Sequence, residues 1–212
     1  MRKLTLAIIL GLIVGIPLFS QAGSVFVQLS FDGIYYPFYN YPDYKNDGSY
    51  KMEVDLTYYI SNRVAFSTGL EYETKKFMKD YQSANHVIDE EKFDLRYFIF
   101  PLQLEIEIFK KGGNSFSTMT GFELGRLISK DRYIKYQDGT VVNEFDDYYI
   151  DKFITNFALG LSYRFIFTNN CFLGVSPNIR FNVSNSQGIH GDSGQGTALS
   201  YIMRLFIGYK FK

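Results

Sequence analysis

The sequence is poor in the residue types that most often carry catalysis, metal binding or covalent cross-linking. It contains one cysteine, Cys171, two histidines and no tryptophan. A single cysteine cannot form a disulfide within the chain, and His86 and His190 fall in two different segments. Basic and acidic residues number 22 each, so the charge balance gives no reason to expect a nucleic-acid partner.

Long apolar runs are also missing, apart from one at the start of the chain. Two basic residues precede an apolar stretch over 4–19, and Ser-Gln-Ala at 20–22 places small residues where a signal peptidase reads them. We therefore predict a signal peptide at residues 1–22, cleaved before Gly23. The shortness of the run and Pro17 argue against an uncleaved membrane anchor.

The remaining domain, residues 23–212, is rich in apolar and aromatic residues at alternate positions. The last segment, 198–212, shows this pattern most clearly, in Leu199, Tyr201, Met203, Leu205, Ile207, Tyr209 and Phe211. This alternation is longer than an ordinary strand of about 5–6 residues. It fits the roughly 9–11 residues that a strand needs to cross a membrane in a barrel.

Seven further segments show comparable alternation: 24–35, 49–60, 64–75, 92–109, 115–128, 153–167 and 171–183. Three of their connections are tight turns, and the other four, at 36–48, 76–91, 129–151 and 184–197, are long. Tight turns at one rim and long loops at the other are typical of outer-membrane barrels, with the turns in the periplasm. We predict an all-β fold, an eight-stranded antiparallel up-and-down transmembrane β-barrel. Within 92–109 the alternation changes phase beside Pro101, which indicates a β-bulge.

The tight turns also predict register, because opposed residues of an antiparallel pair must share a face. Folding at Asn62, Gly112 and Asn169 keeps residues of the polar face of one strand opposite residues of the polar face of the next. The expected pairs are Glu53 with Glu71, Asp55 with Gly69, Glu105 with Met119, Glu107 with Ser117, Arg164 with Gly174 and Gly160 with Asn178.

Charged residues on the inward faces form a candidate network in the lumen. Its members are Glu53, Glu71, Arg96, Glu105, Glu107, Glu123, Arg164, Arg180 and Arg204. An ion pathway or proton relay is one interpretation. We favour a structural role, because eight strands enclose only enough space for their own side chains and buried charges must pair. Because Glu53 opposes Glu71, we predict that Arg96 bridges the two carboxylates.

Three other groups of residues have plain interpretations. Gly-Asp-Ser-Gly at 191–194, next to His190, resembles the nucleophile motif of chymotrypsin-like proteases but lies in a glycine-rich loop that needs such residues for turns. The acidic group Glu144, Asp146, Asp147 and Asp151 lacks the spacing of a calcium loop. We expect the tyrosines and Phe38 within 35–44 to anchor the barrel at the membrane interface. We predict no catalytic, cofactor-binding or metal-binding residues and no cofactor.

Several stretches resemble the "porin-family" outer-membrane β-barrel domains, which include PorT-like secretion-associated barrels. They are Phe-Ile-Phe-Pro-Leu-Gln-Leu at 98–104, Gly-Phe-Glu-Leu-Gly at 121–125 and Phe-Ile-Gly-Tyr-Lys-Phe at 206–211. The resemblance implies export to the bacterial outer membrane and contact with outer-membrane lipid. The closing strand, with Phe211 next to last, resembles the signal by which the outer-membrane assembly machinery recognises its substrates.

For function we expect a structural, adhesive or secretion-accessory role through the long extracellular loops, where an unknown protein partner would bind. One alternative is a soluble periplasmic lipocalin-like barrel, in which the apolar faces would line a ligand cavity. Against it, the polar faces contain small residues such as Gly160 and Gly174, which suit a crowded interior better than a solvated surface. A second alternative is a rim hydrolase that uses His190 or Ser193.

Overall fold

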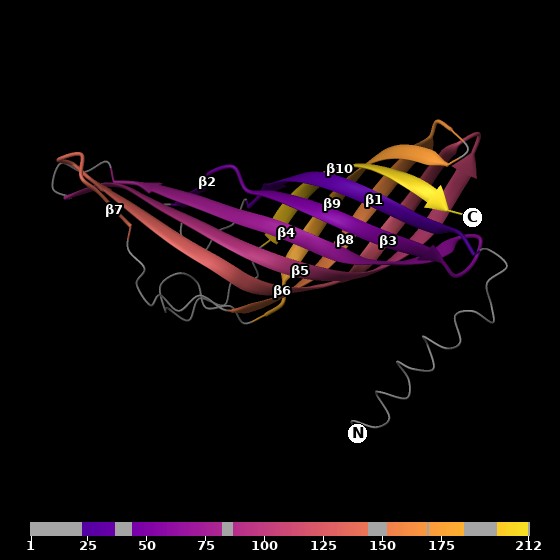
Figure 1. Ribbon diagram of the computed structural model, residues 1–212, viewed down its shortest axis with the longest axis horizontal. Helices are drawn as coiled ribbons and strands as arrows, with labels where there is room; N and C mark the ends of the chain where they lie inside the picture. The colour runs from indigo at the N-terminus through magenta and orange to yellow at the C-terminus, as the bar shows by residue number, and fades with distance from the viewer. Residues whose placement is uncertain are drawn as a thin grey trace, which may run out of the picture.

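Eight strands close into a ring in which every neighbouring pair is antiparallel (Figure 1). The computed structural model describes residues 23–36, 44–81, 87–143, 152–168, 170–184 and 199–211. The ring strands are β1 (Val25–Tyr35), β3 (Tyr50–Tyr59), β4 (Val64–Asp80), β5 (Ile88–Lys111), β6 (Asn114–Tyr136), β8 (Phe153–Ile166), β9 (Cys171–Asn182) and β10 (Leu199–Phe211). Pairing of β1 with β10 and of β4 with β5 closes the ring. The predicted eight-stranded antiparallel barrel is confirmed.

Apolar side chains cover the outside of the ring, and polar side chains line the middle of its inside. On β10, Leu205 is 59% exposed while its neighbour Arg204 is 2% exposed, and the same alternation runs along β1 and β3. A lipocalin-like barrel has the opposite arrangement, with its apolar face inside, so that alternative is wrong.

The register predicted from the tight turns is confirmed at all three hairpins. Glu53 opposes Glu71 across β3 and β4, Glu105 opposes Met119 across β5 and β6, and Arg164 opposes Gly174 across β8 and β9. The turn between β5 and β6 contains Gly112 and Gly113, with φ of 56° and 83°, values that favour glycine.

The predicted change of phase at Pro101 is wrong. Odd-numbered residues face inward without interruption from Glu91 to Glu107, and the pairing of β5 with β4 keeps a single register over this span. The irregularity lies one strand away, on β6, where Ile128 is an extra residue between the pairs Arg96–Ser129 and Tyr97–Leu127. The pattern misled because residues 97–100 are aromatic or aliphatic on both faces of the strand.

Three ring strands continue beyond the others and form a flat extension at one end of the barrel (Figure 1). We call it the outer sheet: residues 74–80 of β4, 88–96 of β5 and 129–136 of β6, with β2 (Tyr44–Asn46) on one edge and β7 (Val141–Asn143) on the other. Residues 76–80, 88–91 and 129–136, predicted as parts of long loops, are therefore strand. They are rich in charge because strands outside a bilayer need no apolar face toward lipid.

The tight turns and both strand ends nearest the termini lie at the opposite end from the outer sheet, since Val25 pairs with Phe211. The predicted signal peptide, residues 1–22, lies outside the described residues. In the part of the chain that the structure describes, no helix combines the length and apolarity needed to cross a bilayer.

Candidate functional site

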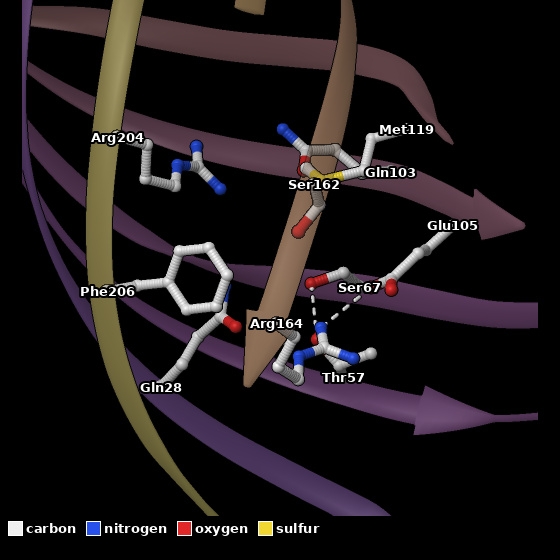
Figure 2. Close-up of a pocket in the computed structure, with 10 residues that line it drawn as sticks. All are labelled: Gln28, Thr57, Ser67, Gln103, Glu105, Met119, Ser162, Arg164, Arg204 and Phe206. Carbon is white, nitrogen blue, oxygen red and sulfur yellow. Dashed lines mark hydrogen bonds and ion pairs between the residues drawn. The ribbon is translucent and has the colours of Figure 1, made fainter. Parts of the chain in front are cut away.

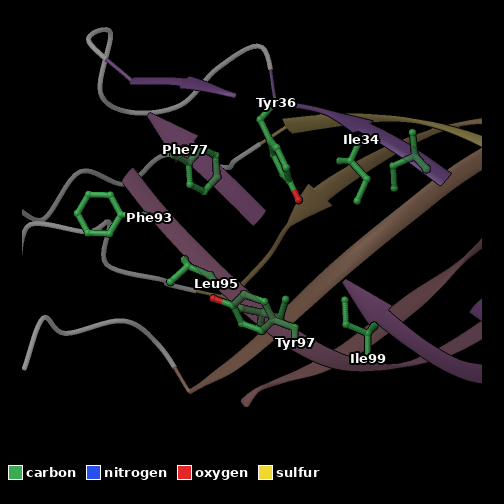
Figure 3. Close-up of a cluster of buried hydrophobic side chains, with 9 residues drawn as sticks. Ile34, Tyr36, Phe77, Phe93, Leu95, Tyr97 and Ile99 are labelled. Carbon is green, nitrogen blue, oxygen red and sulfur yellow. The ribbon is translucent and has the colours of Figure 1, made fainter. Parts of the chain in front are cut away.

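An apolar layer, the outer plug, fills the lumen at the end that carries the outer sheet (Figure 3). Its buried members are Ile34, Tyr36, Phe77, Phe93, Leu95, Tyr97, Ile99, Ile154 and Ile202. They come from five strands or their immediate ends, and the ring of Tyr36 meets that of Phe77 edge-on at 5.6 Å between centroids. The outer plug inverts the simple rule that a membrane barrel is polar inside.

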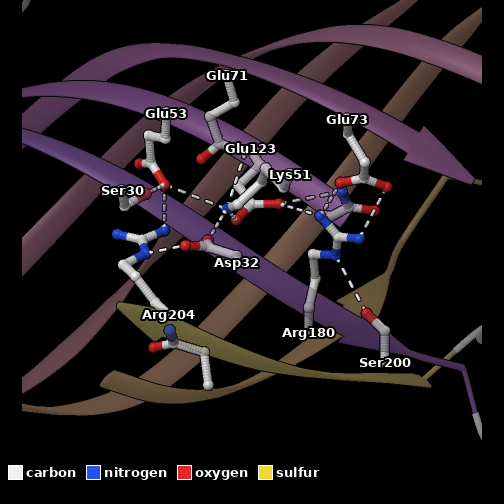
Figure 4. Close-up of polar contacts among 12 residues, drawn as sticks. Ser30, Asp32, Lys51, Glu53, Glu71, Glu73, Glu123, Arg180, Ser200 and Arg204 are labelled. Carbon is white, nitrogen blue, oxygen red and sulfur yellow. Dashed lines mark hydrogen bonds and ion pairs between the residues drawn. The ribbon is translucent and has the colours of Figure 1, made fainter. Parts of the chain in front are cut away.

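Below the outer plug lies a buried charge layer (Figure 4). It comprises Asp32, Lys51, Glu53, Asp55, Glu71, Glu73, Glu123, Arg180 and Arg204. Arg204 of β10 binds three carboxylates: its Nη2 lies 2.5 Å from Glu53, its Nε 3.3 Å from Asp32 and its Nη1 3.5 Å from Asp55. The planar guanidinium suits this because its five N–H groups point in different directions.

Arg180 of β9 reaches across the lumen to the opposite wall. Its Nη1 and Nη2 donate to the two oxygens of Glu73 on β4, at 2.5 and 2.9 Å, and Nη1 also lies 3.1 Å from Glu123 on β6. Nη2 donates to the Tyr36 hydroxyl at 2.9 Å, and that hydroxyl donates in turn to Glu73 at 2.8 Å. Bidentate pairing of this kind fixes geometry as well as charge, so it ties β9 to strands that it does not pair with.

Lys51 is the cation shared by most of the acids. Its Nζ lies 3.1 Å from Glu71, 3.3 Å from Glu53, 3.4 Å from Asp32 and 3.8 Å from Glu123. The side chains of Lys51 and Glu71 are both 0% exposed. A single ammonium therefore separates carboxylates that would otherwise face each other without water.

A second apolar layer, the inner plug, closes the lumen on the side of the tight turns. It consists of Phe26, Tyr59, Ala65, Phe172 and Phe206. Two inward glycines make room for its rings: a Cβ on Gly174 would lie 2.2 Å from the Phe206 ring, and one on Gly208 would lie 2.3 Å from the Phe172 ring.

Arg164 lies within the inner plug. Among the described residues, it is the only arginine whose guanidinium is buried in this plug. Its charge centre is 5.0 Å from the Phe172 ring centroid and 5.1 Å from that of Phe26. It also donates to the Tyr59 hydroxyl at 2.9 Å and to Glu105 at 3.1 Å. Cation–π and charge-assisted contacts together replace the water that the guanidinium loses on burial.

Between the inner plug and the charge layer the lumen narrows to a cavity of about 10 Å³ (Figure 2). Neutral polar side chains such as Gln28, Thr57, Ser67 and Ser162 line it together with the charged Glu105, Arg164 and Arg204. This volume is at the lower limit for one water molecule. At this level the described side chains therefore leave no room for an open channel.

Eight of the nine residues predicted for the lumen network lie buried inside the barrel: Glu53, Glu71, Glu105, Glu107, Glu123, Arg164, Arg180 and Arg204. They form two groups, because Glu105, Glu107 and Arg164 belong to the inner plug region and the other five to the charge layer.

The prediction is wrong for Arg96. Its side chain is 35% exposed and points outward from β5, where it lies 3.1 Å from Asp94 and 3.1 Å from Asp131. The error follows from the misplaced phase change, which assigned the apolar residues of 93–99 to the outer face. Asp94 and Asp131 are directly opposed across β5 and β6, so Arg96 does bridge two facing carboxylates, but on the outside.

Two central residues were missed from the sequence. Lys51 is absent from the predicted network, although its register partners on both sides are acidic, Asp32 on β1 and Glu73 on β4. Tyr36 was assigned to an interface anchor and instead lies in the lumen. Tyr35, its neighbour, does face outward at 59% exposure.

Several candidate residues lie outside the described part of the chain: the motif at 190–194, His86, and the acidic group at 144–151. Among the residues that are described, no cluster of three or more His, Cys, Asp or Glu side chains has an arrangement that could hold a metal ion. The many acids of the charge layer are spaced by Lys51 and the two arginines rather than gathered around an empty centre.

The fold, the outward apolar faces and the filled lumen define a membrane β-barrel. The family described as "Outer membrane protein beta-barrel domain" matches residues 19–191, and the chain belongs to this family. Its location is the bacterial outer membrane.

Solved structures of similar fold are outer-membrane barrels with low sequence identity. The N-terminal barrel of OprF from Pseudomonas aeruginosa is 13% identical, with a TM-score of 0.48 over 89% of this chain and 98% of that one. Ail from Yersinia pestis, in complex with a heparin analogue, is 12% identical, with a TM-score of 0.47 over 89% and 99%. OprG from Pseudomonas aeruginosa is 10% identical, with a TM-score of 0.48 over 90% and 96%. No curated protein sequence matches the chain.

Proposed function

We propose that the protein is a non-conducting outer-membrane barrel that presents its outer sheet and adjoining loops to a protein partner outside the cell. The role would be adhesive, structural or secretion-accessory. One observation carries the proposal: β4, β5 and β6 continue as strands past a lumen that is closed by two apolar plugs and a charge layer. For contacts with a protein outside the cell, a barrel with a closed lumen has its outer end to offer.

The outer sheet has the rigidity that a display surface needs. Its inner face is anchored in the outer plug through Phe77 and Phe93, which are 1% and 3% exposed. Ion pairs connect side chains on its outer face. Lys92 pairs with Glu90 at 2.9 Å, and Arg96 lies between Asp94 and Asp131. At the β6–β7 turn the Thr140 amide donates to Asp138 at 2.8 Å and holds the pKa of that carboxyl below its usual value.

Two short edge strands flank the outer sheet and offer a chemical means of binding. β2 and β7 are only three residues long each, and an edge of a sheet carries backbone donors and acceptors to which a partner can add a strand. Val141 on β7 is 60% exposed. We propose that a partner protein engages this end, that lipid contacts the apolar outward faces, and that the assembly machinery recognises β10.

A trimmed barrel tests the proposal. Met78 pairs with Lys92, so replacing residues 79–91 with Asn-Gly closes a two-residue hairpin while keeping Phe77 and Phe93 in the outer plug. We expect the trimmed protein to insert normally and to shift on unheated gels. We expect it to lose the proteins that photo-cross-link to the intact chain through residue 141 of β7, which both chains keep, in living cells. We also expect it to lose any adhesion or secretion phenotype that the intact chain restores. Lys92→Gln, which removes a charge but no strand, is the matched control.

An unchanged set of cross-linked proteins and full rescue by the trimmed barrel would contradict a role for the outer sheet. We also propose that the chain is not an enzyme. A screen of peptide and ester substrates against the intact protein and Ser193→Ala addresses this, and turnover that disappears in the variant would show a rim hydrolase instead.

A further inference from the structure

The outward wall of the barrel carries one arginine that has no carboxylate to pair with among the described residues, and it stands in an aromatic row. Register pairs Tyr72 with Phe98, Phe98 with Arg126, and Arg126 with Phe153, so these four outward residues lie side by side on β4, β5, β6 and β8. The Arg126 guanidinium lies 6.0 Å from the Phe153 ring centroid. Arg96, the next outward arginine toward the outer sheet, is by contrast paired with two aspartates.

This row marks the outer boundary of the membrane-facing band. Aromatic side chains gather at bilayer interfaces, and Tyr72 and Phe98 contact each other edge-on at 5.9 Å. Above the row the outward face is charged, at Asp94, Arg96 and Asp131. One step below the row, the outward residues are Leu70, Phe100, Leu124 and Thr155, none of them charged.

A groove of about 460 Å³ begins at Arg126 and descends into this apolar zone. Phe98, Phe100, Leu124 and Phe153 form its sides, and its floor is the wall at Ile99, Gly125 and Ile154, residues that face the lumen. The volume lies in the range of small-molecule sites, roughly 300–1,000 Å³. The groove is open on its outer side, as a site on a lipid-facing wall must be.

We propose that the groove binds an acyl chain of a phosphorylated glycolipid of the outer leaflet, and that Arg126 binds its phosphate. The geometry fixes the polarity of the ligand: an anion at the interface and a hydrocarbon chain pointing toward the membrane centre. Arginine suits a phosphate because its fork donates two parallel N–H bonds. An outer-leaflet lipid has this polarity, whereas an inner-leaflet lipid would place its phosphate at the opposite rim.

The test uses the full mature chain in nanodiscs of phosphatidylcholine, titrated with purified lipid A and followed by native mass spectrometry. We expect one lipid A to remain bound to the unchanged protein. Arg126→Gln should weaken this binding about tenfold, by analogy with the loss of a charge-assisted bidentate contact. Thr155→Trp, which narrows the groove and keeps Arg126, should weaken it as well. Lipid A without its phosphates should bind the unchanged protein and Arg126→Gln equally weakly.

Arg63→Gln is the matched control, because Arg63 is an exposed arginine in the tight turn between β3 and β4, and it should leave lipid A binding unchanged. Gel shifts on heating verify that each variant is folded. Equal losses for Arg63→Gln and Arg126→Gln would show general charge attraction and overturn the proposal. Unchanged binding in both groove variants would overturn it too, as would a mass showing a second copy of the chain in place of lipid A.

Discussion

Lys51 shows how much of the interior depends on one side chain. It lies within 4 Å of four carboxylates contributed by β1, β3, β4 and β6. Two of these, Glu53 and Glu71, are directly opposed. Like charges in that position destabilise a sheet, and with no bulk water to screen them the ammonium is the group that allows them to coexist.

Replacing Lys51 with Met should therefore be strongly destabilising. It leaves buried carboxylates without their shared cation, at a cost of roughly 3–5 kcal/mol in the free energy of unfolding. Urea-induced unfolding in detergent measures it. The double variant Lys51→Met with Glu71→Gln should recover part of the loss, and simple additivity would show that the two residues are not coupled.

Arg96 should behave differently although the same charge is removed. Its partners are on the outside, at 35% exposure, and pairs of that kind contribute about 0–1 kcal/mol. Arg96→Met should thus change unfolding by about 1 kcal/mol or less under the same conditions. A loss as large as that of Lys51→Met would place Arg96 in the lumen after all.

At the scale of single strands, the membrane-crossing part of the fold could be predicted and the rest could not. Alternation identified every ring strand, and the tight turns set three registers correctly, because one face had to meet lipid. Beyond the bilayer that constraint ends, so the outer ends of β4, β5 and β6 looked like loops. At residues 97–100 both faces of the strand are apolar. The alternation of apolar and polar residues therefore could not show which face points into the lumen.

The charge layer was recognised only in part for a related reason. Pairing along the sheet links neighbouring strands, but Arg180 meets Glu73 across the lumen, from strands that share no hydrogen bonds. Such contacts depend on the diameter and stagger of the closed ring, which no local pattern contains. Lys51 could have been found, since its acidic neighbours Asp32 and Glu73 are register partners.

The lipid-facing side of β10 makes a prediction at Leu205. This residue is 59% exposed and lies midway between Tyr201 and Tyr209 on the outward face. Leu205→Arg should cost roughly 2–4 kcal/mol, the value for a cation at the bilayer centre. Refolding equilibria in lipid vesicles measure it. Tyr209→Arg, nearer the interface, is the control and should cost clearly less.

The inward side of β10 gives another prediction, at the contact between Phe206 and Gly174 of β9. Because Gly174 leaves the space that the Phe206 ring occupies, Gly174→Val should destabilise the barrel by about 1–3 kcal/mol through overpacking. Adding Phe206→Ala should relieve the part of the clash that the ring causes, while the Tyr163 carbonyl oxygen, 2.5 Å from the new Cβ, remains. Phe206→Ala should therefore cost less in the variant than in the unchanged chain. Independent, additive effects in urea unfolding would show that the ring does not lie against Gly174.

For the whole molecule, the two plugs on either side of the charge layer predict that the barrel conducts no ions. An ion would have to pass Ile34, Ile99, Ile154 and Ile202 at one level and Phe26, Phe172 and Phe206 at another. Eight strands leave no aqueous channel once side chains fill the lumen. Planar bilayer recordings should show no large, stable unitary currents, and reproducible openings in purified protein would contradict the sealed lumen.

The unbroken run of β4, β5 and β6 from the tight turns to the outer sheet has a mechanical consequence. A pulling force on the outer end of these strands acts along their length. Neighbouring strands can then separate only by shear, and many backbone hydrogen bonds resist the force at the same time. A loop hinged at the rim would instead peel open one bond at a time. Whatever grips the outer sheet therefore pulls directly on a wall that is embedded in the membrane.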